Sequence, residues 1–291
     1  MASTTTTMTP DFEVKFLLDS SLVLDSQLSK PTEAVRTLLG LPEKTTKMGV
    51  QFLDTPSREL YNAGWSPRIR KIEGEAGFEL TYKKRYPIVN SEGGVIGGGG
   101  LAQALSLAFR DGFDNTDTKY EAQVEWGYAK QTLSISRKKK VKKDDKKNKE
   151  SVELPDEKDS QKYLTEEAPG KFDDWSFEGW GKSLLKEAVV YGPVLAKRWE
   201  GASKGIEVDF EVWPVRTADR LGLENITEVS FKSDGSIDAE AKREQVRQLL
   251  AEAGLLLPRD SLKTELIMTR YGPVQEEEGQ GGEACEDDEE E

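Results

Sequence analysis

The feature that most constrains the fold is a set of short segments in which charged and apolar residues alternate. In residues 11–16 acidic and basic side chains fall at every second position, and the positions between them are apolar; residues 68–70 and 208–212 repeat the alternation. Successive side chains of a β-strand point to opposite faces, so charges two residues apart share one face. Lys83 ends a similar segment at residues 80–83, and Glu228 is the single charge within residues 226–229. Because both signs of charge occur, the segments predict an interior lined for a metal and a polyanion.

Composition excludes several classes of site. Histidine is absent, which rules out a histidine general base, a Ser-His-Asp triad and histidine-ligated zinc or iron. The only cysteine, Cys285, lies within residues 276–291, so no intrachain disulfide and no thiolate metal site are possible. Any metal must therefore be a hard cation on carboxylate oxygens, namely Mg²⁺, Mn²⁺ or Ca²⁺.

The acidity of the chain is concentrated at its end. Residues 276–291 hold ten acidic residues and no basic one, while the net charge of the whole chain is −13. We expect a disordered stretch at 1–9, a single domain over 10–275 and a disordered acidic tail at 276–291. No apolar run approaches the ~20 residues that cross a bilayer, and residues 1–10 lack the apolar centre of a signal peptide. We expect a cytoplasmic protein without a membrane partner, as a monomer or weak dimer.

The hydrophobic pattern predicts an α+β fold with three or four helices and a mainly antiparallel sheet of about eight strands, which is either open or closed. Pro31, Thr32 and Gly40 delimit one helix, and Asp238 and Gly254 are expected to cap and end another. We predict helices at 32–39, 101–110, 175–190 and 237–253, and strands at 12–18, 50–54, 65–72, 77–84, 120–136 (one strand or a hairpin), 194–199, 206–215, 225–232 and 265–271.

Two stretches interrupt the pattern, at 88–119 and 137–172. The first contains the glycine-rich residues 93–100, which could cradle phosphate before a helix but lack the Gly-Lys-Ser/Thr of a P-loop, so a flexible insertion is the simpler interpretation. The second begins with nine basic residues in 137–149. A nucleic-acid patch is one hypothesis; without interleaved aromatic residues we favour a solvated loop and expect no nucleic-acid partner.

At this point the motifs resemble a known family. Asp11-Phe-Glu13-Val-Lys15 is similar to the Glu-x-Glu-x-Lys signature of CYTH domains, also called triphosphate tunnel metalloenzymes. Residues 53–70 resemble that family's Tyr-Asp-Thr…Gly…Arg-x-Arg block, and residues 80–83 its next strand. The later half, at 196–198, 208–211, 227–230 and Lys263 with Arg270, looks most like the thiamine triphosphatase branch. The resemblance spans about residues 10–273, interrupted by the two insertions.

The resemblance implies an eight-stranded closed β-tunnel in which basic residues grip a triphosphate and carboxylates hold Mg²⁺ or Mn²⁺. Transferred position by position, it implies metal ligands at Asp11, Glu13, Asp209 and Glu228, with Glu211 able to assist. The implied triphosphate contacts are Lys15, Arg68, Arg70, Lys83, Arg198 and Lys263. Among all of these we expect Glu13, Lys15 and Arg198 to take part in the chemistry itself.

The chain departs from the family pattern at three positions. Asp11 replaces a glutamate, Ser230 replaces the second acid of a Glu-x-Glu pair, and Trp65 is shifted by one residue from the branch's tryptophan. That odd shift turns a strand side chain to the other face, so we expect Trp65 to pack in the core rather than stack on thiamine.

The expected function is metal-dependent hydrolysis of thiamine triphosphate or inorganic triphosphate. Three alternatives stay open at this stage. The chain could bind (poly)phosphate without turnover because of Ser230, or use the same fold for other chemistry on a phosphorylated metabolite, such as cyclising a nucleotide. It could also bind nucleic acid through 137–149.

Overall fold

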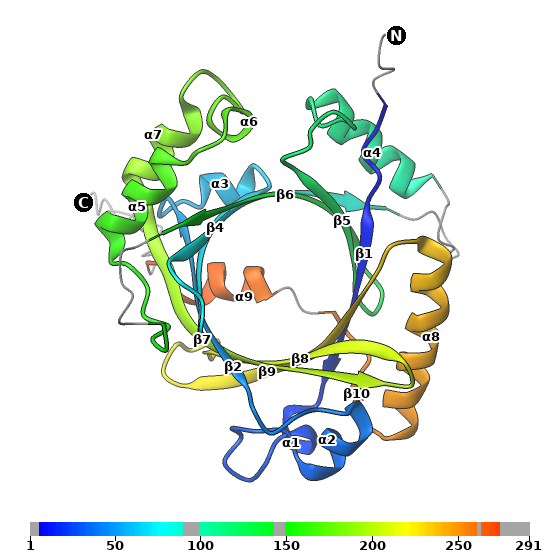
Figure 1. Ribbon diagram of the computed structural model, residues 1–291. Coiled ribbons are helices and arrows are strands. Elements are labelled where there is room, and N and C mark those ends of the chain that lie inside the picture. The colour runs from blue at the N-terminus through cyan, green and yellow to red at the C-terminus, as the bar shows by residue number, and fades with distance from the viewer. Residues whose placement is uncertain (1–5, 90–98, 143–148, 261–262, 274–291) are drawn as a thin grey trace, which may run out of the picture.

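The computed structural model describes residues 6–89, 99–142, 149–260 and 263–273. Its centre is a ring of nine strands (Figure 1). The ring closes because β1 pairs with β9 on one side and with β5 on the other. The order around the ring is β1-β5-β6-β4-β3-β2-β7-β8-β9, and the short β10 (Leu256–Leu257) pairs with the end of β1. The ring strands are β1 (Asp11–Leu18), β2 (Thr46–Asp54), β3 (Trp65–Ile72), β4 (Phe78–Ile88), β5 (Glu121–Trp126), β6 (Gln131–Val141), β7 (Val189–Ser203), β8 (Ile206–Arg216) and β9 (Leu223–Ser233).

The prediction of a mainly antiparallel sheet of eight strands needs a correction in its number, because the ring has nine strands, of which one pair is parallel. β1 and β5 run in the same direction, with Asp11 opposite Gln123 and Val14 opposite Trp126. More than a hundred residues separate these two strands along the chain, and a connection of that length permits a parallel pairing that a short hairpin forbids. Closure leaves the ring without free edges.

Helices cover the outside of the barrel and bury its apolar outer face. α2 begins after Thr32, whose side chain accepts the Val35 N–H, and ends at Gly40 in the left-handed conformation (φ 61°), both as predicted. The outer helices are α1 (Ser20–Val23), α2 (Glu33–Leu39), α3 (Glu59–Asn62), α4 (Gly100–Arg110), α5 (Glu157–Glu166), α6 (Gly170–Asp173), α7 (Trp180–Glu187) and α8 (Ser236–Glu252).

Trp65 belongs to this outer core, as the parity of the strand predicts. It is 0% exposed and lies edge-on to Phe172 and Trp175, with ring centroids 5.2 and 5.5 Å away. Both partners come from the 137–172 insertion or just after it, so the insertion is packed against the barrel. Trp65 is therefore a packing residue and does not face the interior.

Several predicted elements differ in extent from the observed ones. The basic run does not start as a loop: Arg137 to Val141 continue β6, and residues 143–148 lie outside the described residues, as do residues 93–98 of the glycine-rich stretch. The predicted helix at 175–190 shrinks to α7 because residues 189 and 190 already pair with β2. Asp238 does not cap α8; Gly235 holds the cap position, and Asp238 accepts the Ser233 hydroxyl instead.

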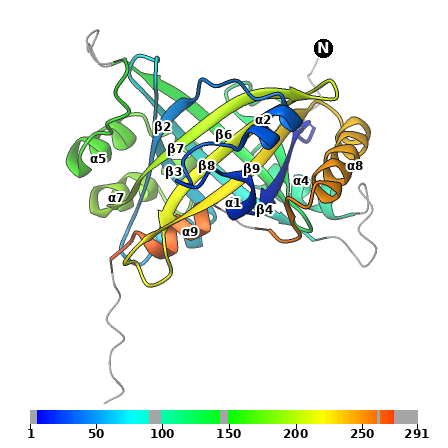
Figure 2. The same ribbon diagram turned by 90° about the horizontal axis from the view of Figure 1, so that it is seen from below.

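The largest correction concerns the end of the chain, where the predicted strand at 265–271 is the helix α9 (Lys263–Arg270). α9 lies within the ring in Figure 1 and toward one end of the barrel in Figure 2. Its Ile267 and Met268 are buried against an apolar inner surface of β2, β7 and β8 that includes Phe52 and Trp213. α9 thus fills one part of the interior and leaves the rest to polar side chains. Within the described ranges, no helix has the length and apolar character needed to span a membrane.

Candidate functional site

The barrel encloses a cavity of about 370 Å³ between α9 and the opposite strands. Its wall is polar because the inward positions of the strands alternate with apolar positions that face the outer helices. The structure brings every site residue predicted from the sequence to this one cavity; they are Asp11, Glu13, Lys15, Arg68, Arg70, Lys83, Arg198, Asp209, Glu211, Glu228 and Lys263.

The basic side chains gather on β3 and β4. Arg70 donates to Glu79 at 2.7 Å, and Arg68 donates to the Thr81 hydroxyl at 3.2 Å, with Glu79 3.7 Å away. The Nε atoms of both arginines are buried without a hydrogen-bond partner. Burial, reinforced by the charge of Arg70, lowers the pKa of Arg68 to about 10. A buried cation with an unused donor is costly, and an anion in the cavity relieves that cost.

Arg85 extends the same wall and was missed in the sequence. It follows Lys83 by two residues on β4, so both point into the cavity. Its guanidinium donates to the Ser66 hydroxyl at 2.6 Å and to the Thr264 hydroxyl of α9 at 3.3 Å. The i+2 spacing from Lys83 was the signal that could have identified it.

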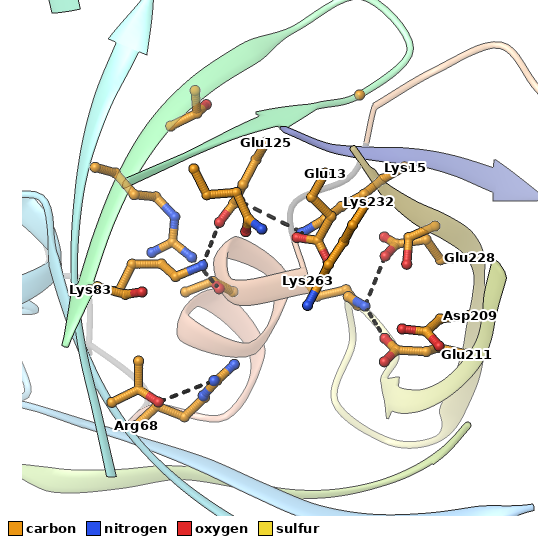
Figure 3. A pocket seen from close by; sticks show the side chains of 18 of the residues that line it. Glu13, Lys15, Arg68, Lys83, Glu125, Asp209, Glu211, Glu228, Lys232 and Lys263 are labelled. Carbon is orange, nitrogen blue, oxygen red and sulfur yellow. Dashed lines mark hydrogen bonds and ion pairs between the residues drawn. The ribbon is translucent and has the colours of Figure 1, made fainter. Parts of the chain in front are cut away.

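Glu125 on β5 is the second residue that the sequence did not single out. It is 8% exposed, and its two oxygens lie 2.5 Å from Lys83 Nζ and 3.8 Å from Lys15 Nζ (Figure 3). Lys15 also lies 2.8 Å from Glu13. Burial pushes the pKa of Glu125 upward, but the charges of Lys15 and Lys83 hold it well below its usual range. Glu125 is therefore an internal counter-ion for two lysines of the predicted phosphate site.

The acidic side chains gather on β8 and β9. Glu211 and Glu228 are directly opposite each other in the antiparallel pair, and they are 5% and 3% exposed. Like charges in this position repel each other. Lys263 of α9 lies between them, 2.6 Å from Glu211 and 3.0 Å from Glu228 (Figure 3). Burial raises the pKa of Glu228, although Lys263 and Lys15 oppose the rise.

Arg198 on β7 is the cation that pairs with Asp209 and Glu211 on the acidic side of the cavity. Its Nε and one terminal nitrogen donate to the same oxygen of Glu211 at 2.8 and 2.6 Å, and another terminal nitrogen lies 3.7 Å from Asp209. The remaining oxygen of Glu211 also accepts the Trp213 indole N–H at 2.8 Å. Arg198 is thus bound to carboxylates on this side of the cavity, away from the arginines of β3.

The predicted metal ligands are not assembled into one cluster. Among the residues that the structure describes, no group of three or more acidic side chains is placed to hold a metal ion. Asp11 is exposed at the start of β1, and Glu13 is bound to Lys15. Glu211 and Glu228 share Lys263 as their cation, and their oxygens are the donor type that Mg²⁺ and Mn²⁺ prefer. These two residues fit a metal by chemistry, at a position that Lys263 fills.

Ser230 follows Glu228 by two residues on β9, so its side chain lies on the same face of the strand, and it is 5% exposed. The strand register places it between Lys15 on β1 and Asp209 on β8. An acid at this position would join Asp209 and Glu228 on one wall. The serine leaves that wall with fewer carboxylates.

No protein-family model matches the chain, and no curated protein does either. Solved structures resemble it at low identity, and three of them are described here. A Hippeastrum protein described as an adenylyl cyclase candidate with a dominant triphosphatase activity has a TM-score of 0.46 and 13% identity, over 90% of this chain and 96% of its own. An adenylate cyclase candidate from Bacillus halodurans has 0.44 and 14%, over 88% and 96%. A protein from Pyrococcus horikoshii has 0.41 and 12%, over 88% and 98%. At these values the likenesses assign no activity to the chain.

Proposed function

We propose that the chain binds a triphosphate inside the barrel and hydrolyses its terminal phosphoanhydride bond with a divalent cation, Mg²⁺ or Mn²⁺. The observation that carries the proposal is the division of one closed cavity into two walls. Arg68, Arg70 and Lys83 form a basic wall on β3 and β4, and Glu211 faces Glu228 on the acidic wall. Triphosphate transfer chemistry depends chiefly on positioning and charge neutralisation, which such an arrangement supplies.

The basic wall supports binding of the phosphate chain. Arg68 and Arg70 each have one side-chain hydrogen-bond partner and an Nε atom without any, so a phosphate in the cavity would bring negative charge to two guanidinium groups that are not fully paired. Lys83 and Lys15 have Glu125 as their counter-ion, so a bound phosphate would share these lysines with that carboxylate. Arginine forks and lysine point charges are the usual means of holding phosphate in proteins.

The acidic wall supports the hydrolytic half of the proposal. In hydrolysis, water forms a new bond to the terminal phosphorus while the bridging P–O bond breaks, which gives phosphate and a diphosphate. The cation, when bound, supplies charge neutralisation of the phosphoryl oxygens and a lower pKa for water. Glu211 and Glu228 would hold it, and Arg198 fixes Glu211 from the side through two N–H groups.

The organic part of the substrate has few groups to contact. The aromatic side chains of the cavity wall are Phe52, Tyr61 and Trp213; Phe52 and Trp213 belong to the apolar cluster that α9 packs on, and Tyr61 lies beside it. Trp213 already carries Lys263 over its ring, 4.5 Å from the centroid. Thiamine triphosphate and inorganic triphosphate both enter the proposal, and a comparison of turnover between them decides which one the cavity favours.

The decisive experiment is phosphate release by the purified full chain with Mg²⁺ or Mn²⁺ from inorganic triphosphate, thiamine triphosphate and ATP. We expect release from at least one of the first two, with diphosphate or thiamine diphosphate as the second product. Arg70→Ala should abolish it, whereas Lys140→Ala, at an exposed pair with Glu75 outside the cavity, should not. Absence of turnover across the panel would refute hydrolysis, and a cyclic product from ATP would indicate a cyclase.

A second candidate, binding of triphosphate without turnover, is favoured by Ser230. The serine replaces a carboxylate beside Asp209 and Glu228, so the acidic wall carries less negative charge than the family pattern implies. This candidate predicts heat of triphosphate binding by calorimetry in the absence of any phosphate release. The same two measurements therefore separate the candidates.

A further inference from the structure

The position of Lys263 has a consequence for how a metal enters the barrel. Its ammonium nitrogen lies 2.6 Å from Glu211 and 3.0 Å from Glu228, and these two glutamates face each other in register across β8 and β9. Among the residues that the structure describes, Lys263 Nζ is the only atom that forms hydrogen bonds to both carboxylates. A metal ion bound by the same two oxygens would occupy the same place.

Lys263 is held there by more than one contact. It stacks over the Trp213 ring, and its neighbour Thr264 accepts a hydrogen bond from Arg85 at 3.3 Å. The rest of α9 is anchored independently, because Ile267 and Met268 are buried in the apolar inner cluster. Arg270 also donates to Glu224 at 2.5 Å on β9. The second half of α9 thus has anchors that do not involve Lys263.

We propose that Lys263 and a divalent cation compete for one site between Glu211 and Glu228, so that metal entry releases the first turn of α9 from the barrel wall. The inference rests on the proposed function only in that a divalent cation enters the barrel. It assigns Lys263 a second role: the lysine is the internal cation that neutralises the acid pair when no metal is present.

The charges of Glu211, Glu228 and Lys263 explain why one cation excludes the other. Two buried, opposed carboxylates need a positive charge between them, and an ammonium supplies one charge while Mg²⁺ or Mn²⁺ supplies two. Metal–oxygen bonds of about 2.0–2.2 Å also draw the oxygens closer than the hydrogen bonds of an ammonium do. Both cannot lie between the same oxygens, since two cations at that distance would repel each other in a site that water screens less than the outer surface.

Displacement of Lys263 would also change a contact of the basic wall, through the neighbouring Thr264. Thr264 follows Lys263 directly, so movement of the first turn breaks the hydrogen bond from Arg85 to the Thr264 hydroxyl. Arg85 then keeps its bond to Ser66 and has free donors toward the cavity. Metal entry would in this way prepare one more guanidinium for phosphate, and the two ligands would bind with positive cooperativity.

Mn²⁺ binding to the full chain tests the competition without any substrate. Electron paramagnetic resonance titrations should give a dissociation constant about tenfold lower, or lower still, for Lys263→Met than for the unchanged chain, which is within the usual range of coupling between two ligands. Lys263→Arg keeps the positive charge and should show no such gain. Lys140→Met removes one charge from an exposed pair and serves as the matched control. Glu228→Gln, which removes half of the acid pair, measures the background from other acidic groups.

A second measurement uses the unchanged chain and does not depend on the folding of any variant. Acetylation of lysines, followed by peptide mass spectrometry, should show more modification of Lys263 when Mn²⁺ is added and no change at Lys140. Equal or weaker Mn²⁺ binding by a folded Lys263→Met chain would overturn the proposal, as would unchanged or reduced acetylation of Lys263 with Mn²⁺ bound. Loss of hydrolysis alone would leave it standing and refute only the proposed function.

Discussion

Glu125 Oε1 lies 2.5 Å from Lys83 Nζ inside the barrel, and this pair is bonded across β5 and β4 with Lys15 close to the second oxygen. The contact is buried, so its energetic consequences differ from those of the ion pairs on the outer surface. Removing one partner of a buried pair leaves the other charge without compensation.

The first prediction concerns stability. Glu125→Gln should lower the free energy of unfolding by about 3 kcal/mol, because Lys83 and Lys15 lose their shared counter-ion in a buried place. Denaturant unfolding followed by circular dichroism measures the change. Glu75→Gln, which breaks the exposed pair with Lys140, should leave the unfolding midpoint unchanged. An equal effect of the two substitutions would show that Glu125 is no buried counter-ion.

The second prediction concerns the arginines of the basic wall. Arg68→Ala and Arg70→Ala should each weaken triphosphate binding by about 10- to 100-fold, which corresponds to the loss of charge-assisted hydrogen bonds. Arg70→Lys should recover only part of the loss, because lysine lacks the planar fork. Calorimetric titration without metal measures binding apart from turnover. Full affinity in both alanine variants would place the phosphate elsewhere.

The third prediction follows from Lys83. Burial, together with the positive charges of Arg85, Lys15 and Arg68, outweighs Glu125 and lowers the pKa of Lys83 to about 8. Between about pH 7 and pH 9 the unchanged chain should therefore lose roughly tenfold more of its triphosphate affinity than Lys83→Arg, in which the positive charge persists. Superimposable pH profiles for the two chains would rule out a titrating Lys83 in the phosphate site.

The same group affects stability with a definite sign. The folded pKa of about 8 lies below the ordinary value of 10.5. Between these two values the unfolded chain binds more protons at Lys83 than the folded chain does, so the contribution of Lys83 to stability rises with pH through that window. Unfolding midpoints of the unchanged chain and Lys83→Met, compared across the window, measure this contribution.

The fourth prediction concerns Ser230. Ser230→Glu should tighten Mn²⁺ binding and, if the chain hydrolyses triphosphate slowly, raise the rate, because it adds a carboxylate next to Asp209 and Glu228. Ser230→Ala removes the hydroxyl without adding charge and is the control. The serine lies between Lys15 and Asp209, so Lys15 can partly compensate the new charge. Identical Mn²⁺ affinities of the glutamate and alanine variants would contradict the prediction.

Much of the barrel could be predicted from the sequence, because the alternation of side chains between the two faces of a strand is a local property. Alternation in β1 and β8 correctly placed Glu13 and Glu211 on the inner side, and the ends of α2 followed from Thr32 and Gly40. Glu125 has the same parity in β5, but parity does not say which face of a strand is the interior. In this barrel the polar face points inward and the apolar face lies beneath helices.

The features that sequence could not supply depend on distant parts of the chain. Residues 265–271 contain β-branched and large apolar side chains, yet they form a helix because Ile267 and Met268 fill the inner apolar surface that β2, β7 and β8 create. The parallel pairing of β1 with β5 likewise depends on how the ring closes. The assignment of roles to the cavity residues stays a prediction until the experiments above are done.

The closure of the ring by β1 also determines when the protein can fold during synthesis. β1 pairs with β9, whose last residue is Ser233, and with β5, so it finds no antiparallel neighbour until most of the chain has left the ribosome. Until then the edge of β1 that pairs with β9 has unpaired backbone groups, and such an edge invites association with other chains. The contacts that complete the barrel also join residues far apart in sequence, which slows folding. Production of this protein should therefore depend strongly on growth temperature and chaperones, for reasons unrelated to the stability of the finished barrel.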